Sequence, residues 1–454
     1  MRGTSTPSSS PGRTRARPSR AAPAWALCAW ALAGPGAAGA ADAIPGEQWC
    51  DGRPIARVAF AGNRVTKPEV MARELPLEPG DACALDGVID GFQPLEDLGL
   101  FRAVRAELEL GARGELVLRY VVREKFFFIG VPRLSRTTDG ELRAGVSLEW
   151  DNFLGRLHEL EIRSEWRQED DGRGHEGFVN RIDYEVPRLL GTPYGFGVGL
   201  RSERRGVDFA RDGVAYGVGE RRVLGLGVGL ARWLDGDGTQ GTRLFLGTGI
   251  EHRELDVETG DPGFALDGLD LNFRIGAERR DVRLDRWRRT GHRYGVSFGF
   301  ANRALGSDFT WHRADAWGNL YLALPGGGLR NLNVRAVLGA SDGAPFGERF
   351  YSVGGGERLR GPDKGTREGD VQLLVNTELL TAFVARPAIR WVLFADVGNV
   401  WPRREIELAE LDWGAGAGLR WKVQAISDAD LRVDLAWDHA EERVRPYLST
   451  KLTF

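Results

Sequence analysis

From Lys125 to the end of the chain, apolar side chains alternate with glycine or charged residues. In YGFGVGL, residues 194–200, the aromatic and aliphatic side chains share one face of a strand and three glycines share the other. The pattern recurs in LGLGVGL (224–230), YGVSFGF (294–300), WGAGAGL (413–419) and LRVDLAW (431–437). A period of two predicts strands with one apolar face, and both soluble sandwiches and membrane β-barrels are built of such strands.

Three features favour the membrane barrel. No apolar run of about 18 residues follows residue 40, so no helical span is expected. The small-residue faces also carry polar side chains suited to a water-filled lumen, namely Asn272, Arg274, Arg335 and Asp434. Tryptophans lie near segment ends, where aromatic girdles meet the membrane interface, at Trp233, Trp317, Trp401 and Trp421.

The number of strands follows from the length of the repeating region. An unpaired strand edge in hydrocarbon costs several kcal/mol per group, so the strands must close into a barrel. At about 9 to 11 residues per strand plus turns, residues 125–454 predict a 16-stranded antiparallel transmembrane β-barrel, which makes the chain mainly β. The segments are expected to begin near Glu141, Arg156, Phe178, Tyr194, Arg221, Gly241, Gly268, Arg293, Arg313, Arg330, Gly347, Val371, Ile389, Asp412, Ala429 and Arg445.

Residues 1–40 have the layout of a secretory signal peptide. Five arginines without an acid precede an alanine-rich apolar run, and Ala38-Gly39-Ala40 supplies a small-residue cleavage site. A disordered leader or a misassigned start codon is the alternative. Export of the chain is therefore expected, with residues 41–51 forming the mature N-terminal segment.

Charge and cysteine content narrow the partners and the compartment. Loss of the five arginines would change the formal net charge from -3 to about -8, so nucleic acid is not an expected partner. Two cysteines then remain, Cys50 and Cys83. An even count in an exported protein favours a disulfide, with two free buried thiols as the alternative.

Residues 52–124 predict a small α/β domain with the order β-α-α-β-β. A strand over IARVAFA leads into Thr66-Lys67-Pro68-Glu69, a helix-start signal. A second helix is expected from Leu85 to Leu98, and two alternating segments up to Glu124 then form a hairpin. With the Gly-Asn turn at residues 62–63 and LEDLGLF at residues 95–101, this order resembles a POTRA domain. The resemblance implies a periplasmic module that binds extended segments by adding a strand at a sheet edge.

A POTRA-like domain before a sixteen-stranded barrel resembles the BamA/TamA superfamily of outer-membrane assembly and secretion proteins. FYSVGGGERLRG (350–361) is similar to the family's long loop that plugs the barrel, and Leu359, Arg360 and Gly361 match the motif at its tip. Pro362 stands where an aromatic residue is usual. DNFLG (151–155) is a further match.

The resemblance also implies a partner for Arg360. FADVG matches the family's strand motif with Phe394, Asp396 and Gly398, and the family pairs its loop arginine with this aspartate. A guanidinium and a carboxylate in a partly desolvated lumen can form a two-pronged, charge-assisted pair. The alternative is a solvated arginine in an external loop.

The C-terminus carries a further signal. In RPYLSTKLTF, Leu448, Leu452 and Phe454 lie on one side, and a terminal phenylalanine resembles the signal by which outer-membrane barrels are recognised for assembly.

Nothing in the sequence indicates catalysis. The six histidines have no metal-ligand spacing and no nucleophile motif beside them. Glycine strings such as GVGERRVLGLG lie in strands and lack the strand-to-helix context of a nucleotide site. We therefore expect no enzyme activity, no metal and no cofactor.

The predicted function is assembly or insertion of outer-membrane proteins, or translocation of a polypeptide, by an accessory or specialised member. The alternative is an outer-membrane pore for small solutes. The expected partners are the outer-membrane lipid bilayer, an unfolded or extended polypeptide and periplasmic accessory proteins. The barrel is expected in the outer membrane of a Gram-negative bacterium, with the POTRA-like domain in the periplasm.

Overall fold

The computed structural model describes residues 44–136, 142–168, 176–211, 214–235, 240–260, 267–284, 287–326, 329–362, 367–383, 385–423, 430–439 and 441–449. The predicted signal peptide at residues 1–40 lies outside the described residues, as do Leu452 and Phe454 of the predicted assembly signal. Among the helices that are described, none is long and apolar enough to cross a membrane.

The N-terminal part is a small α/β region. After a short 3-10 helix, η1 (Glu47–Trp49), its elements are β1 (Ile55–Ala61), α1 (Pro68–Ala72), α2 (Leu85–Asp90), α3 (Phe92–Asp97), β2 (Phe101–Leu110) and β3 (Leu116–Glu124). The sheet order is β1-β3-β2, with β1 parallel and β2 antiparallel to β3. Where the sequence predicts one helix after residue 84, there are two, separated at Gly91. Pro94 has no N–H to donate to the carbonyl of Asp90, so a continuous helix would lack that bond.

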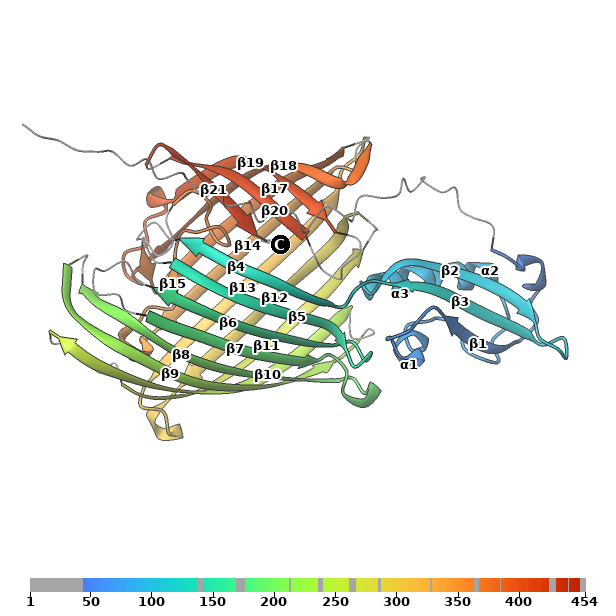
Figure 1. The fold of residues 1–454 in the computed structure, drawn as a ribbon, viewed down its shortest axis with the longest axis horizontal. Coiled ribbons are helices and arrows are strands. Elements are labelled where there is room, and N and C mark those ends of the chain that lie inside the picture. Colours follow the sequence, from blue (N-terminus) through green and yellow to red (C-terminus); the bar gives the residue numbers. More distant parts are fainter. Residues whose placement is uncertain are drawn as a thin grey trace, which may run out of the picture. The chain divides into compact units, whose positions relative to one another are not determined.

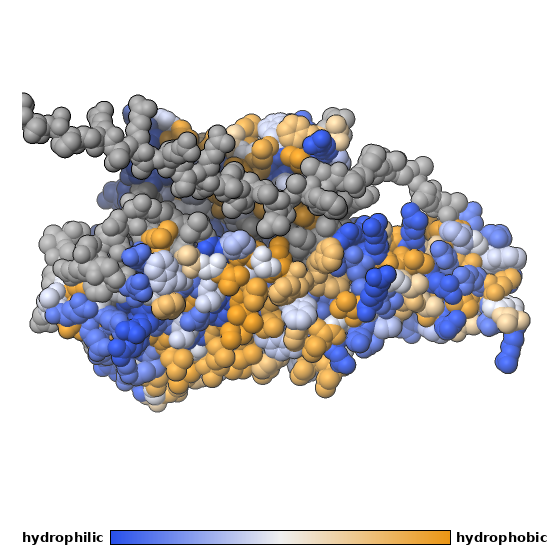
Figure 2. All heavy atoms as spheres, in the orientation of Figure 1, coloured by the Kyte–Doolittle hydropathy of each residue, from blue (hydrophilic) through white to orange (hydrophobic). Residues whose placement is uncertain are grey.

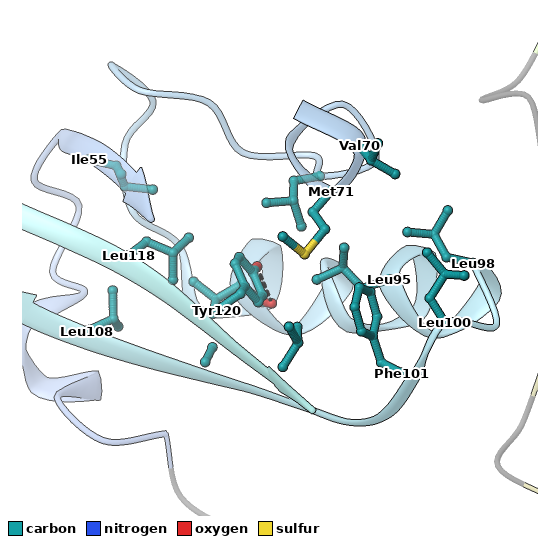
Figure 3. Close-up of a cluster of buried hydrophobic side chains, with 14 of the residues drawn as sticks. Ile55, Val70, Met71, Leu95, Leu98, Leu100, Phe101, Leu108, Leu118 and Tyr120 are labelled. Carbon is teal, nitrogen blue, oxygen red and sulfur yellow. Dashed lines mark hydrogen bonds between the residues drawn. The ribbon is translucent and has the colours of Figure 1, made fainter. Parts of the chain in front are cut away.

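The helices pack against the sheet through one apolar core (Figure 3). Val70 and Met71 come from α1, Leu95 comes from α3, and Leu118 and Tyr120 come from β3. All five are buried. The strand alternation and the three- and four-residue spacing of the helices therefore converge on a common core.

Tyr120 supplies a polar contact inside this core. Its hydroxyl donates to the Val88 carbonyl at 3.0 Å, and burial raises the pKa of Tyr120 to about 12. Tyr120→Phe should remove this bond, leave the carbonyl unpaired and destabilise the region by about 1 kcal/mol. Faster hydrogen exchange in β3 at neutral pH would reveal the loss.

The raised pKa also predicts a loss of stability in alkali. The folded region favours the neutral phenol, so its contribution is present below about pH 10, the pKa of an unfolded tyrosine. This contribution declines as the pH rises through about 12. An absorbance titration of the tyrosines should lose one step near pH 12 in Tyr120→Phe, and an unchanged titration would contradict this prediction.

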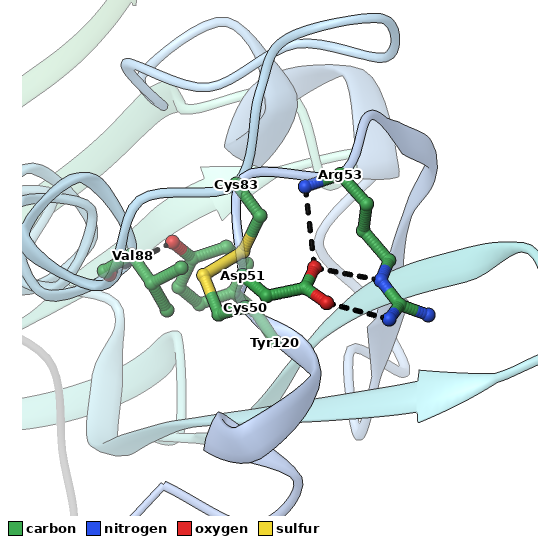
Figure 4. The surroundings of a disulfide bond; sticks show 6 residues. All are labelled: Cys50, Asp51, Arg53, Cys83, Val88 and Tyr120. Atoms are coloured by element: carbon green, nitrogen blue, oxygen red, sulfur yellow. Dashed lines mark hydrogen bonds and ion pairs between the residues drawn. A yellow bond between two sulfur atoms is a disulfide. The ribbon is translucent and has the colours of Figure 1, made fainter.

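A disulfide joins Cys50 to Cys83 and ties the segment before β1 to the segment before α2 (Figure 4). The predicted disulfide is therefore confirmed, and the alternative of two free thiols is excluded. Beside it, Arg53 Nε and Nη2 donate to the two carboxylate oxygens of Asp51 at 2.8 and 2.7 Å. The bond from Arg53 lowers the pKa of Asp51 to about 2.

Sixteen strands form one antiparallel sheet that curves into a barrel (Figure 1). They are β4 (Phe128–Arg136), β5 (Leu142–Phe153), β6 (His158–Gln168), β7 (Glu176–Val186), β8 (Tyr194–Arg211), β9 (Val214–Trp233), β10 (Gly241–Thr259), β11 (Gly268–Leu284), β12 (Arg289–Ala301), β13 (Trp311–Ala323), β14 (Asn331–Asp342), β17 (Val371–Phe383), β18 (Arg386–Trp401), β19 (Asp412–Lys422), β20 (Asp430–Asp438) and β21 (Arg443–Ser449). Neighbours in sequence are neighbours in the sheet, except that β14 pairs with β17 across a long loop. The predicted fold class is confirmed.

The expected set contains one wrong segment and misses one strand, and the two errors cancel in the total. β4 is absent from the expected set, because Pro132 interrupts its alternation. Proline is tolerated there since β4 is an edge strand of the sheet. The segment expected near Gly347 is no wall strand but part of the loop between β14 and β17. Its start is bent by left-handed backbone at Phe346 and Gly347.

The two faces of the strands differ as the alternation predicts. Leu226, Leu246 and Ile275 are exposed on the outer surface. Apolar side chains gather over the strands in Figure 2. On the opposite face, Asp434 is fully buried, and Asn272 shares its strand face with buried Asp270.

The tryptophan prediction is largely wrong. Trp233 and Trp401 are buried, and Trp317 lies against Gly295 of the neighbouring strand on the inward face. Only Trp421 of the four expected residues is exposed on the outer surface. These tryptophans were chosen because they lie near strand ends. Whether such a residue faces the lumen or the membrane depends on whether it occupies an inward or an outward position in the alternation along its strand. Other tryptophans are exposed on the outside, at Trp150, Trp413 and Trp437.

Candidate functional site in the barrel lumen

Between β14 and β17, the described loop residues 343–362 and 367–370 lie against the inner wall of the barrel. It contains η4 (Pro345–Gly347) and a short pair, β15 (Tyr351–Ser352) with β16 (Glu368–Gly369). Leu359 near its tip is fully buried beside Tyr351 and Val353 of the loop and Leu374 and Val400 of the wall. This apolar contact anchors the loop beside the charged group that follows Leu359.

Arg360 is fully buried at the tip of this loop. Its Nε and Nη2 donate to the two carboxylate oxygens of Asp396 on β18, at 2.5 and 2.6 Å. The backbone N–H of Arg360 donates to the same carboxylate at 3.1 Å. The pair thus has the planar, two-pronged geometry that makes arginine–carboxylate contacts strong and directional.

Two more carboxylates hold the same guanidinium. Arg360 Nη1 donates to Glu378 Oε1 on β17 at 2.7 Å and to Asp434 Oδ2 on β20 at 3.2 Å. Burial alone would lower the pKa of Arg360, but the hydrogen bonds and the charge of Asp396, aided by the two other carboxylates, raise it above its usual value. The arginine is therefore held charged in a buried place.

Two wall arginines complete the group. Arg420 on β19 donates to Asp434 Oδ1 at 2.5 Å and to Glu378 Oε1 at 2.6 Å. Arg432 on β20 donates to Asp434 Oδ2 at 2.6 Å and to the Gly356 carbonyl of the loop at 2.9 Å. The arginine cluster, defined as Arg360, Arg420 and Arg432 with Asp396, Glu378 and Asp434, contains three positive and three negative groups. Balanced, hydrogen-bonded charges are what burial of ions requires.

The aromatic ring of Phe394 packs against the Arg360 guanidinium. The Arg360 guanidinium carbon lies 3.7 Å from the ring centroid of Phe394. A Cβ on Gly416 would lie 2.6 Å from that ring, so glycine in β19 leaves room for it. Cation–π contact adds to the ion pairs without needing another charge.

Close backbone contacts fix the loop tip as well. Gly361 has φ +119 and its N–H donates to the Tyr447 hydroxyl of β21 at 3.1 Å. Asn376 of β17 donates to the Arg358 carbonyl at 2.6 Å. The tip therefore contacts strands that are far apart in sequence but face one lumen.

Gly414 in β19 lets the loop backbone approach the wall. A Cβ at Gly414 would lie 1.9 Å from the carbonyl oxygen of Arg360. Gly414→Ala should therefore push the tip away and destabilise its docked position by about 1–3 kcal/mol. Hydrogen exchange across residues 353–362 should rise. Gly227→Ala in β9 is the matched control, because nothing lies within 4 Å of its added Cβ; equal exchange in the two variants would refute the steric argument.

A second contact attaches the start of the loop to another part of the wall. Glu348 pairs with Arg221 of β9 and, at 2.9 Å, with Arg253 of β10. The Arg253 guanidinium carbon lies 3.9 Å from the ring centroid of Phe346. The loop is thus held against β9 and β10 near its start and against β17 to β20 at its tip, so it spans the lumen.

The described residues among the predicted lumen and assembly-signal positions lie in three places: at the loop tip, beside it on β18, and on the outer side of β21. Leu359, Arg360, Gly361, Phe394 and Asp396 come together at the loop tip, whereas Gly398 packs against the Leu373 carbonyl and does not touch the arginine. Leu448 is exposed on the outer side of β21. The functional roles of these residues stay predictions.

The sequence did not predict several residues of the arginine cluster. Glu378, Arg420 and Arg432 were not expected, and Asp434 was expected only as a lumen residue. The inward position of charged residues between apolar ones in LRVDLAW is the signal that could have revealed Arg432, since a charge pointing inward needs a partner. The Glu348 contact has no comparable local signal.

Comparisons with known proteins identify the family and the fold. Residues 152–446 match the Omp85 superfamily domain. No curated protein is significantly similar to the chain in sequence. Among solved structures, BamA from Haemophilus ducreyi lacking POTRA domains 1–3 has a TM-score of 0.53 at 18% identity, covering 86% of this chain and 82% of that one.

Two further structures have the same fold. CdiB from Escherichia coli has a TM-score of 0.58 at 16% identity, covering 87% of this chain and 74% of its own. CdiB from Acinetobacter baumannii has a TM-score of 0.56 at 15% identity, covering 85% and 70%. At these identities the likeness concerns the fold alone.

Proposed function

Because the chain belongs to the Omp85 superfamily, we propose that it inserts barrel proteins into the outer membrane or translocates a dedicated polypeptide across it. In this proposal it acts as an accessory or specialised member, with the POTRA-like unit of residues 52–124 before the barrel. That unit lies in the periplasm. No catalytic step is part of this proposal.

The observation that carries the proposal is the loop held inside the lumen. Arg360 is buried among three carboxylates, and Glu348 attaches the same loop to β9 and β10. A pore for small solutes works best with an open lumen, whereas a factor that handles polypeptides at strand edges does not depend on one.

Available strand edges support the handling of extended chains. β2 is an edge strand of the N-terminal sheet, although the segment before β1 already occupies one position of this edge, where the Leu108 N–H donates to the Pro45 carbonyl at 2.8 Å. β4 and β21 are the two ends of the sixteen-strand order, and among the described residues no ladder joins them. An edge with unpaired N–H and C=O groups is a template for pairing with another strand.

Reconstitution tests the proposal. The protein is placed in liposomes, and the rate at which an unfolded barrel substrate becomes protease-resistant is compared with the rate in empty vesicles. Acceleration that falls in Arg360→Ala is the expected result. If no version exceeds empty vesicles while ion conductance appears, the pore alternative replaces the proposal.

A further inference from the structure

A polar hollow in the lumen adjoins the arginine cluster through Glu378. It includes the first residues of β12, β14, β18 and β20 and the last residues of β13, β17 and β19. Because successive strands alternate in direction, these residues lie at the barrel end where β4 begins after the α/β region. The hollow has a cavity volume of about 20 Å³, so it takes a small polar group and not a bulky ligand.

Positive charge predominates around this hollow. Four basic side chains line it, Arg288, Arg289, Arg390 and Lys422, against two acidic ones, Glu378 and Asp430. Glu378 already accepts hydrogen bonds from Arg360 and Arg420 of the arginine cluster. Asp430 lies directly opposite Lys422 in the β19–β20 register. The electrostatic balance therefore favours an anion in the hollow.

Arg390 is the residue that points most clearly to a ligand. It is only 6% exposed and lines the hollow. No hydrogen bond or ion pair joins Arg390 to any residue within the described ranges. Arg420, its neighbour in the β18–β19 register, is by contrast paired with both Asp434 and Glu378. The carboxylates of Asp430 and Glu378 act on Arg390 only from beyond hydrogen-bond distance, so an anionic ligand would supply the direct contact that this guanidinium lacks.

An unused hydrogen-bond acceptor lies in the same lining. Asn331 is 1% exposed, and its Nδ2 donates to Asn333 Oδ1. Its own Oδ1 is buried and accepts no hydrogen bond from the described part of the chain. A ligand that carries both an anion and N–H groups would satisfy both Arg390 and Asn331.

We propose that this hollow binds the carboxylate of an acidic side chain in an extended polypeptide that enters the barrel from the end at which β4 begins. The lining side chains belong to the inward face of the strands, away from the lipid-facing surface, which argues against a lipid headgroup. A peptide supplies a carboxylate for Arg390 and backbone N–H groups for Asn331. The choice of a polypeptide rests on the proposed function, whereas the preference for an anion rests on the hollow alone.

Binding of a matched peptide pair tests this site without measuring insertion. The full chain is placed in phosphatidylcholine nanodiscs, which carry no net lipid charge. Fluorescently labelled extended peptides differ only by one glutamate or one glutamine, and their C-termini are amidated. We expect the glutamate peptide to bind about tenfold more tightly, as one charge-assisted hydrogen-bonding contact predicts.

Variants show which residue causes the preference for the glutamate peptide. Arg390→Gln should abolish it while heat-dependent mobility on gels stays that of the folded protein. Arg390→Lys keeps the charge but loses the planar fork, so the preference should fall to about threefold; this variant carries the test if Arg390→Gln does not fold. Arg274→Gln is the matched control, because Arg274 faces the lumen from β11, outside the hollow. It should keep the full preference.

Three results would overturn the proposal: equal affinity of the two peptides for the wild type, an unchanged preference in both Arg390 variants, or an equal loss in Arg274→Gln. Binding of inorganic phosphate, with no binding of either peptide, would also overturn it in favour of a small oxyanion. Peptide preference without acceleration in the liposome assay would refute the proposed function but keep the site. The converse would refute the site alone.

Discussion

Replacing Arg360 with alanine should release the lumen loop. The substitution leaves Asp396 without its two-pronged partner and removes one of three positive groups from a buried, balanced cluster. Stranding a buried charge in this way costs on the order of 3 to 5 kcal/mol. We expect hydrogen exchange across residues 350–362 to rise steeply, with altered heat-dependent mobility on gels and a slower rate in the liposome assay.

Arg358→Ala is the control for this experiment. Arg358 lies two residues away in the same loop but is exposed, and its Nη1 donates only to the Ser352 carbonyl. Its loss should cost at most about 1 kcal/mol. Arg360→Lys should be intermediate, because an ammonium cannot replace the two parallel bonds of the guanidinium. Unchanged exchange and mobility in Arg360→Ala would show that the loop does not depend on this residue.

Removal of the disulfide should have the second large effect. Cys50 and Cys83 are separated by 33 positions, and a cross-link over such a loop restricts the unfolded chain by about 3–4 kcal/mol. The double variant Cys50→Ser/Cys83→Ser should therefore open its α/β region far more often than the wild type. Protease cleavage within residues 52–124 should be faster, while cleavage in the barrel should not change.

Reduction of the wild-type protein is the control for the disulfide. A thiol reductant should reproduce the faster cleavage in the wild type and add nothing in the double variant. Equal cleavage rates for oxidised wild type and double variant would mean that the core around Met71, Leu95 and Tyr120 holds the region without the bond.

Local patterns in the sequence were enough to predict most of the architecture. Side chains alternate sides along a strand. The apolar faces of YGFGVGL and LRVDLAW could therefore be predicted from each segment alone, without information on the adjacent strands. Likewise, an even cysteine count in an exported chain predicted the disulfide. Arg360 and Asp396 were paired by resemblance to a family, because nothing in their separation of 36 positions could bring them together.

The failures occurred where a residue's role depends on distant strands. Pro132 interrupts the alternation of β4, so the strand was not predicted. The proline is tolerated only because β4 is an edge strand of the sheet. Trp317 lies at a plausible position for a girdle, yet it faces Gly295 inside the barrel. The prediction used the position of each tryptophan near a segment end but not its parity with the apolar residues of the same strand, and parity decides the face.

The sequence by itself determined the strand period, the apolar outer face, the small α/β region and the glycine-rich loop with Arg360, because each is encoded within a few neighbouring residues. Only the tertiary structure decided that Glu378, Arg420 and Asp434 surround that arginine and that Glu348 attaches the loop to the opposite strands. It also decided that Arg390 lines a hollow with no hydrogen-bond partner among the residues that the structure describes. Those contacts join strands separated by many others, so they exist only after the sheet has curved and its register has set which inward side chains meet.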